Sequence, residues 1–387
     1  MKTNEIVIVA AKRSATGKFR GSLSRLTAVE LATKLVTEML AQTKITPTMI
    51  DQVILGNVLS TGLGQNIARQ VQVKAGLPVT GTAMTINQVC GSGLKAVRLG
   101  QTALMLDDAQ VVLAGGVESM SNAPAFAARK DKKAFALDDF QDTLFYDGLN
   151  DAFGGYAMGV TAENLNRKFN LDRVQLDQYA LLSQKKATQA QQNGFLTEEI
   201  VPINGLAYDE VVRSNTTLDK LATLKPVYQE HGLVTAGNSS PLSDGASIVA
   251  LTTSQTAQEQ GLKPLATIKG FSEVGYQPEL MGYTPVLAIQ KLLQTQQQTV
   301  ADIDWFEVNE AFASQALVVQ QELQIDSAKY NPLGGALALG HALGSSGARI
   351  LTTLVHNLKR TKQKTGIAAL CIGGGQAVAM EVENCEV

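Results

Sequence analysis

Short, wholly apolar segments alternate with segments of helical periodicity, and this alternation restricts the chain to few architectures. Residues 6–11 and 111–114 are continuous apolar runs, which is the pattern of strands covered on both faces. Residues 28–39, behind a capping box at Thr27, and residues 91–106 carry apolar side chains at helical spacing. Strands that alternate with helices need crossover connections, so we predict an α/β fold with a largely parallel sheet.

The order of elements near the start of the chain is repeated near its end. In the first series a short strand at residues 85–89 and a helix after Cys90 lead to a buried strand ending in Leu113-Ala114-Gly115-Gly116. In the second series a helix after Gly344 leads to a strand ending in Leu370-Cys371-Ile372-Gly373-Gly374. We predict two similar α/β halves, related by a pseudo-twofold axis, whose sheets pack between helices and whose corresponding ends meet in one cleft.

The region from residue 122 to residue 233 departs from this alternation. Its charged run at residues 129–133 predicts a solvated loop, and residues 172–192 form a long, polar-faced helical segment that stops before Gly194. We interpret the region as an insertion. The predicted domains are an N-terminal core half at residues 1–121 and 234–264, an inserted loop domain at residues 122–233, and a C-terminal core half at residues 265–387.

The charge balance and the cysteine count exclude several classes of protein. Lysine and arginine number 33 against 35 acidic residues, giving a net charge of −2, which argues against a strongly basic nucleic-acid or anionic-membrane binder. No apolar stretch reaches the ~20 residues of a membrane-spanning helix, and the first residues lack the apolar segment of a signal peptide. Three cysteines cannot build a disulfide framework. We expect a soluble cytoplasmic protein that binds neither nucleic acid nor membrane.

Cys90 lies in Asn87-Gln88-Val89-Cys90-Gly91-Ser92-Gly93, where a predicted strand gives way to a helix. The free N–H groups at a helix N-terminus carry partial positive charge, which predicts a lowered thiol pKa and a reactive thiolate. The flanking glycines allow a ligand to approach the backbone closely. A buried structural cysteine is the alternative, but the glycine-rich context favours a nucleophile.

Three more residues that could take part in a reaction lie at strand ends or in glycine-rich turns. His341 lies in a glycine-rich turn that leads into a helix, which suits a base, with a structural histidine as the alternative. Cys371 ends an apolar strand and precedes Ile372-Gly373-Gly374-Gly375, whose N–H groups can donate to an oxyanion. Asn309 ends another short strand, and its neutral amide can hold a water or a carbonyl oxygen.

Metal and nucleotide chemistry have weaker support in the sequence. Cys90, His341 and Cys371 are an alternative zinc ligand set, but the cysteines lack the paired spacing of structural zinc sites. The chain has neither a Gly-x-x-x-x-Gly-Lys-Ser/Thr phosphate loop nor a Gly-x-Gly-x-x-Gly turn after its first strand. We therefore expect neither a metal nor another cofactor.

Taken in order, the motifs of this chain resemble the thiolase family, and the likeness covers essentially the whole sequence. Residues 147–159 further resemble the short-chain acetoacetyl-CoA thiolases within that family. The fold implied is thiolase-like. The motifs that carry the resemblance, besides those around Cys90 and His341, are Arg13-Ser14-Ala15-Thr16-Gly17, Gly115-Gly116-Val117-Glu118-Ser119-Met120, Ala236-Gly237-Asn238-Ser239-Ser240, Asn309-Glu310-Ala311-Phe312 and Cys371-Ile372-Gly373-Gly374-Gly375.

The resemblance implies condensation of two acetyl-CoA molecules to acetoacetyl-CoA and CoA, with the reverse thiolysis, through an acetyl-Cys90 intermediate. It implies that His341 activates Cys90 and helps bind the thioester oxygen, and that Cys371 moves the α-proton of the second substrate. Asn309 would position a water in one oxyanion hole, and the N–H groups of Cys90 and Gly373 would form the other. Residues implied in coenzyme A and acyl binding are Arg213, Ser240, Ala236, Met158, Met281 and Phe312.

Three positions depart from the family pattern. Ala342 replaces the proline that usually follows the turn histidine, and Pro241 stands where glycine is more usual. Ala157 stands where short-chain members often carry histidine, which predicts an altered acyl pocket.

Two further activities remain open at this point, and the resemblance also implies an assembly. The alternatives are a 3-ketoacyl-CoA thiolase of β-oxidation acting on longer chains and a non-catalytic acyl-CoA-binding protein on the same frame. A ketoacyl carrier-protein synthase shares the general fold, but Cys371 argues against it. The implied assembly is a homotetramer, a dimer of dimers, paired through the loop after Asn122.

Overall fold

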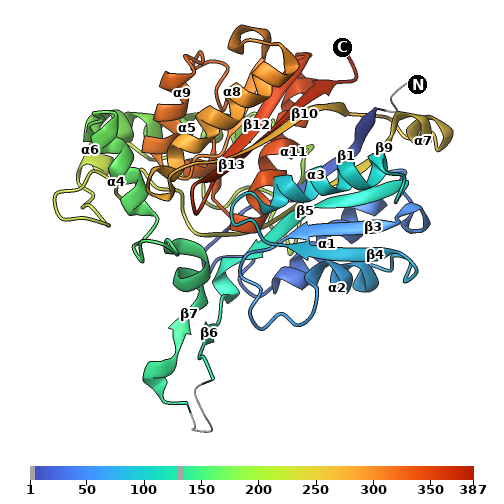
Figure 1. Ribbon diagram of the computed structural model, residues 1–387, viewed down its shortest axis with the longest axis horizontal. Coiled ribbons are helices and arrows are strands. Elements are labelled where there is room, and N and C mark those ends of the chain that lie inside the picture. The colour runs from blue at the N-terminus through green and yellow to red at the C-terminus, as the bar shows by residue number, and fades with distance from the viewer. Residues whose placement is uncertain (1–4, 130–134) are drawn as a thin grey trace.

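The structure is a computed structural model that describes residues 5–129 and 135–387, so the charged run predicted as a loop lies, apart from Arg129, outside the described residues. Within that part, eleven strands form one sheet whose main path is β11-β12-β13-β10-β1-β9-β5-β3-β4 (Figure 1). Its strands are β1 (Ile6–Ser14), β2 (Gly17–Lys18), β3 (Gln52–Gly56), β4 (Thr82–Ile86), β5 (Val111–Ser119), β8 (Ile200–Val201), β9 (Ser243–Thr253), β10 (Ala266–Gly275), β11 (Trp305–Val308), β12 (Thr365–Ile372) and β13 (Gln376–Asn384).

Two series of strands repeat the same order and meet in the middle of the sheet. In the first, β3 pairs parallel with β4 and β5, and β9 and β1 follow antiparallel. In the second, β11 pairs parallel with β12, and β13 and β10 follow antiparallel. The series join where Val7 of β1 opposes Thr267 of β10. The predicted pair of similar α/β halves is thereby confirmed. The expectation of a largely parallel sheet is wrong, because the parallel pairs lie mainly among the outer strands of each half and the long central strands pair antiparallel.

Helices cover both outer faces and fill the space between the two halves (Figure 1). On the first half, α1 (Ala28–Ala41) and α2 (Ile67–Lys74) pack on β9, β5 and β4, and on the second half α8 (Thr284–Gln296) packs on β10, β13 and β12. In the centre α3 (Ser92–Met105) and α11 (Leu343–Thr361) pack against each other. The remaining helices are α4 (Gly159–Lys168), α5 (Arg173–Gln192), α6 (Leu218–Ala222), α7 (Ser254–Glu259), α9 (Ala313–Glu322) and α10 (Ala336–Leu339).

A very close backbone contact brings β5 to the start of α11. A Cβ atom placed on Gly116 would lie 1.9 Å from the carbonyl oxygen of Gly344, so only glycine fits there. The contact joins a strand of the first half to a helix of the second. It brings the residues at the start of α11 next to those at the end of β5.

A local sequence signal sets the start of α1, and one strand was predicted in the wrong place. The capping box at Thr27 and Glu30 is present, with Thr27 Oγ1 accepting from the Glu30 N–H at 3.2 Å. The strand predicted at residues 85–89 is wrong, because β4 is Thr82–Ile86 and the chain turns at Val89. β4 is the edge strand, so little burial distinguishes its apolar residues from the turn that follows.

The region predicted as an insertion is tied to the core by a buried ion cluster. It contains the two-stranded sheet of β6 (Ala125–Phe126) and β7 (Gln141–Asp142), the π-helical segment η4 (Leu144–Leu149), and α4, α5, β8 and α6. β8 pairs with β1, and the buried Arg13 of β1 bonds Glu199 Oε1 at 2.6 Å and both carboxylate oxygens of Asp209 at 2.6 and 2.9 Å. These paired charges fix the insertion against the first half.

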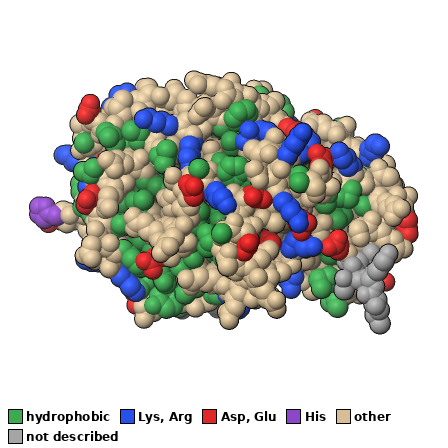
Figure 2. Space-filling model, turned by 90° about the horizontal axis from the view of Figure 1, so that it is seen from above, with side chains coloured by type: hydrophobic (Ala, Val, Ile, Leu, Met, Phe, Trp, Pro, Cys, Tyr) green, Lys and Arg blue, Asp and Glu red, His purple; other side chains and the backbone are tan. Residues whose placement is uncertain are grey.

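The surface agrees with the balanced composition. Basic and acidic side chains are intermingled on the face that Figure 2 shows. Across residues 5–129 and 135–387, no helix is both long and apolar enough to cross a membrane.

Candidate active site

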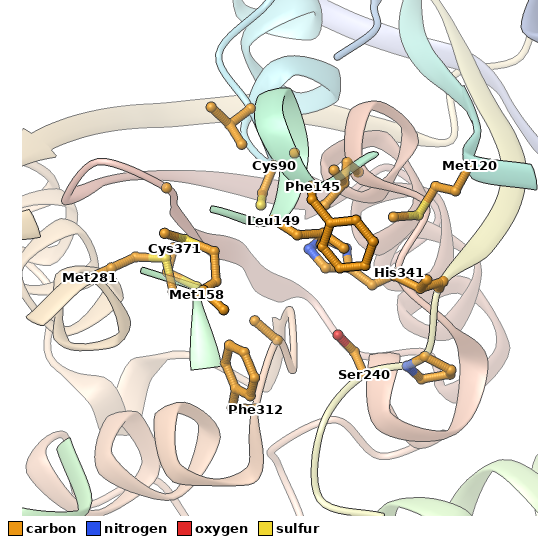
Figure 3. A pocket seen from close by; sticks show the side chains of 18 of the residues that line it. Cys90, Met120, Phe145, Leu149, Met158, Ser240, Met281, Phe312, His341 and Cys371 are labelled. Carbon is orange, nitrogen blue, oxygen red and sulfur yellow. The ribbon is translucent and has the colours of Figure 1, made fainter. Parts of the chain in front are cut away.

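A largely apolar cavity lies where the two halves meet the insertion. Cys90 reaches it from the turn before α3, Cys371 from the end of β12, and His341 from the turn before α11. In Figure 3 these three side chains converge in one space. The structure therefore brings together the two thiols and the imidazole that the sequence predicted, one thiol from each half.

The turn that presents Cys90 is strained and closed by hydrogen bonds. Val89 has φ +46°, a left-handed conformation that β-branched residues rarely adopt. The Val89 N–H donates to Asn87 Oδ1 at 2.9 Å, and Ser92 Oγ donates to the Val89 carbonyl at 2.7 Å. Gln88 is also held, because its side-chain amide donates to Glu273 of β10. The turn thus points the thiol into the cavity, and the bond from Gln88 to Glu273 ties it to the second half.

The predicted lowering of the Cys90 pKa is wrong. Burial raises the pKa of the thiol to about 11, while the N–H groups of Gly373 and of Cys90 itself act in the opposite direction. Desolvation wins because the sulfur lies in an apolar cavity, where a thiolate loses its hydration. Cys90 is therefore a neutral thiol at rest and needs a base to react.

His341 has one ring nitrogen committed and one free. Nδ1 lies 2.6 Å from Ser346 Oγ, whereas the buried Nε2 has no hydrogen-bond partner among the described residues. Burial and, secondarily, the nearby Arg349 charge lower the pKa of the imidazole to about 4. A neutral imidazole with a free nitrogen in the cavity is the form that accepts a proton.

Cys371 and Gly373 form the second side of the reacting centre. Cys371 is fully buried one residue before the end of β12 at Ile372. Burial, followed by the proximity of Cys90, raises the pKa of this thiol. The N–H of Gly373 acts on the Cys90 sulfur and lowers the pKa of that thiol, against the larger effect of burial. Backbone donors beside a nucleophile are suited to stabilise a developing oxyanion.

Asn309 is not among the residues that line the cavity, although Ala311 and Phe312, which follow it closely in the chain, are. It follows β11, and its N–H donates to the Ala369 carbonyl of β12 at 3.0 Å. Both polar atoms of its side chain are buried without a hydrogen-bond partner in the described residues. A buried amide in this state is suited to bind a water molecule.

The acyl-binding residues predicted from the resemblance divide into two groups. Ser240, Met158, Met281 and Phe312 line the cavity, as Figure 3 shows. Arg213 and Ala236 are exposed and lie outside its lining, so their contact with coenzyme A stays a prediction. Two of the three departures from the family pattern, Ala157 and Pro241, also line the cavity, whereas Ala342 lines a separate small cavity.

Several residues of the site were missed in the sequence. Tyr228 of the insertion and Phe145 of η4 line the cavity, and Tyr228 packs edge to face on Phe312 with ring centroids 6.2 Å apart. A Cβ on Gly159 would lie 2.1 Å from the Tyr228 ring. Gly159, two residues after Ala157, is therefore a sequence feature that could have indicated a ring packed close to the backbone at this point.

Glu118 was quoted in a motif but given no role, and it proves to be a buried tether. Its carboxylate accepts from the N–H groups of Val58, Leu59 and Gly344 and from the Asn57 amide at 2.8–3.0 Å. Burial raises its pKa to about 7, against the effect of those donors. It joins the end of β5 to the first turn of α11, directly after His341.

The expectation that no metal is bound rests on the lack of paired cysteine spacing in the sequence. In the part of the chain that the structure describes, no three histidine, cysteine, aspartate or glutamate side chains are grouped as metal ligands.

Comparison with known proteins gives consistent results along the whole chain. The thiolase N-terminal domain family matches residues 6–255, and the thiolase C-terminal domain family matches residues 262–384. The acetyl-CoA acetyltransferase of Cupriavidus necator is 46% identical over 98% of this chain and 99% of its own length. A probable acetyl-CoA acyltransferase of Staphylococcus aureus is 42% identical over 98% and 99%.

Solved structures of two relatives share the fold of this chain along nearly its whole length. The acetyl-CoA acetyltransferase of Bacillus anthracis superposes with a TM-score of 0.95 at 38% identity, covering 99% of each chain. Human mitochondrial 3-ketoacyl-CoA thiolase gives the same score and identity over 100% of each chain, and a further structure of that protein contains CoA.

Proposed function

The chain belongs to the thiolase family of acyltransferases, and we propose that it is an acetyl-CoA C-acetyltransferase that forms acetoacetyl-CoA and CoA from two acetyl-CoA molecules. The observation that carries the proposal is the convergence of Cys90, His341 and Cys371 in one apolar cavity. Its chemistry needs coenzyme A thioesters as substrates and no metal or other cofactor.

In the first half-reaction, His341 Nε2 takes the proton of the Cys90 thiol. The sulfur attacks the carbonyl carbon of acetyl-CoA, and the N–H groups of Cys90 and Gly373 stabilise the negative oxygen that develops. The carbon–sulfur bond to coenzyme A then breaks. CoA leaves with the proton of Cys371, which becomes a thiolate. Because one thioester replaces another, the acetyl group stays activated on the enzyme.

In the second half-reaction, the Cys371 thiolate takes an α-proton from a second acetyl-CoA. The raised pKa of Cys371 suits this step, because a thiol that holds its proton firmly is a strong base once deprotonated. His341 and a water held by Asn309 stabilise the enolate oxygen. The enolate carbon attacks the acetyl group, and Cys90 leaves and recovers its proton from His341.

A second activity is favoured by the wall of the cavity. Ala157, Leu149, Phe145 and Met158 give it an apolar lining in which a longer acyl chain can be buried. This arrangement, together with the likeness to human mitochondrial 3-ketoacyl-CoA thiolase, supports a 3-ketoacyl-CoA thiolase of β-oxidation. Steady-state thiolysis of acetoacetyl-CoA and of a ten-carbon 3-ketoacyl-CoA tests the two. A kcat/KM higher for acetoacetyl-CoA supports the first proposal, and the reverse order refutes it.

The acid limb of the first half-reaction should lie well below the usual histidine range. The pKa of His341 is about 4 in the fold, so the imidazole stays neutral and able to accept a proton as pH falls to about 5. The rate of Cys90 acetylation, measured by rapid quench from pH 5 to 8, should therefore show no histidine limb. A limb centred near pH 6.5 would contradict the desolvated environment described for His341.

We further propose that the protein is cytoplasmic, in agreement with its three unpaired cysteines. We also propose that it assembles as a homotetramer. The edge strand β4 is only partly buried, and an open strand edge is a template on which another chain can pair. The β6–β7 segment projects from the body (Figure 1), and Phe140, Tyr146 and Phe153 nearby are exposed. Sedimentation equilibrium of the purified protein tests this assembly, and a monomer at micromolar concentration would refute it.

A further inference from the structure

The short contact between His341 and Ser346 points to a role that the sequence did not suggest. We propose that Ser346 is a positioning residue, whose hydroxyl holds the proton of His341 on Nδ1 and so presents Nε2 to the two thiols as a proton acceptor. This inference rests on the proposed function, because it concerns how the base of that reaction is prepared.

The direction of each hydrogen bond follows from the donors available. Ser346 Oγ lies 2.8 Å from the Ala342 carbonyl, which can only accept, so the single hydroxyl hydrogen is committed there. The same oxygen lies 2.6 Å from His341 Nδ1 and must therefore accept, which places the imidazole hydrogen on Nδ1. Nε2 is left without a hydrogen, and it is the buried ring nitrogen that has no partner among the described residues.

The backbone on both sides of this pair is fixed. Gly340 takes φ +89° between α10 and the turn, and the His341 N–H lies 3.3 Å from the Pro241 carbonyl. Ser346 lies in the first turn of α11, where Glu118 Oε2 accepts from the Gly344 N–H at 2.8 Å. The imidazole therefore has one rigid acceptor at a set position, and the remaining freedom of the ring is small.

The groups around the imidazole explain why the tautomer matters. Among the described residues, the Arg349 charge on the next turn of α11 acts on the imidazole, the thiols of Cys90 and Cys371 share its cavity, and Glu118 of β5 acts on Cys90. Burial and the Arg349 charge favour the neutral ring, and a neutral ring has two tautomers. With the proton on Nε2 the ring would offer a donor to Cys90 and could not take its proton.

A serine at this position also bonds the carbonyl four residues back, as serines in helices commonly do. If that bond were its whole role, removing the hydroxyl would change stability and leave the reactivity of Cys90 unchanged. The two roles therefore differ in what they predict for the chemistry of another residue.

The test compares Ser346→Ala, Ser346→Thr and the control Ser345→Ala by the rate of Cys90 acetylation from pH 5 to 9. Ser346→Ala should acetylate about 10- to 100-fold more slowly, with the half-saturating acetyl-CoA concentration unchanged. Ser346→Thr keeps a hydroxyl and has room in a small polar cavity beside it, so it should recover most of the rate. Ser345 lies on the same turn but hydrogen-bonds neither ring nitrogen among the described residues, so Ser345→Ala should match the wild type.

A second readout separates this proposal from the proposed function. Alkylation of Cys90 by iodoacetamide needs the same base but no acetyl-CoA, and it should slow in Ser346→Ala by a similar factor. Wild-type rates of acetylation and alkylation in Ser346→Ala, or a loss in Ser346→Thr as large as in Ser346→Ala, would overturn the positioning role. Alkylation that depends on Ser346 in a protein that acetyl-CoA never acetylates would keep the positioning role and refute the proposed function.

Discussion

Replacing Cys371 by alanine is expected to leave Cys90 acetylation within a few-fold of the wild type and to lower condensation by about 10²- to 10⁴-fold. The first half-reaction tolerates the change because CoA can leave as a thiolate and take its proton from water. The second cannot, since the α-proton of acetyl-CoA needs a base held beside the acetylated sulfur. Mass spectrometry of the Cys90 peptide and the rate of acetoacetyl-CoA formation measure the two steps separately.

The matched control for this experiment is Cys385→Ala. Cys385 is the third free cysteine, lies near the end of the chain and is exposed, with a contact to Thr267. The Cys385→Ala variant should be acetylated at Cys90 and should condense acetyl-CoA at the wild-type rates. Condensation at the wild-type rate in Cys371→Ala would remove Cys371 from the mechanism, whereas loss of acetylation as well would mean that its sulfur also prepares Cys90.

Replacing Cys90 by serine is expected to lower condensation and thiolysis by about 10⁴-fold or more. Serine fills nearly the same space but ionises far less readily, and the ester it forms would be less activated than a thioester. Steady-state thiolysis of acetoacetyl-CoA gives the rate. CoA binding, measured by calorimetry, should change little because the cavity keeps its lining.

Unchanged binding with lost turnover would show that the variant is folded and that the sulfur does the chemistry. Activity within tenfold of the wild type would contradict the nucleophilic role. If the wild type itself bound CoA without turning over acetyl-CoA or acetoacetyl-CoA, the chain would be an acyl-CoA-binding protein on a thiolase frame.

Most of the fold could be predicted because its signals are local. The apolar runs that become β1 and β5 are buried along most or all of their length, and the capping box at Thr27 starts α1. The repeated order of helix and strand around α3 and α11 gave the two halves. β4 could not be placed, because an edge strand with mixed exposure and the left-handed turn at Val89 leave no clear period.

The positions of the chemical groups were easier to predict than their electrostatics. Cys90, His341 and Cys371 stand out by their glycine-rich contexts, and they converge as expected. The pKa of Cys90 could not be predicted, since the helix terminus is visible in the sequence but the apolar cavity around the sulfur is assembled from distant segments. Burial then reverses the sign of the shift.

The supporting residues were missed because their partners are far away in the sequence or lack a motif. The Glu118 carboxylate accepts from the N–H groups of Val58 and Gly344, both distant in sequence. Tyr228 reaches the cavity from the insertion. Ser346 is one of two adjacent serines, and only the fold tells which of them reaches the imidazole.

The most direct test of this account is to find where acetyl-CoA leaves its acetyl group on the wild-type protein. Brief incubation with acetyl-CoA, an acid quench and peptide mapping by mass spectrometry locate the label among the three cysteines. The account predicts an acetyl group on Cys90, with release on addition of CoA. Labelling of Cys371 or Cys385 instead, or no covalent label at all, would contradict it.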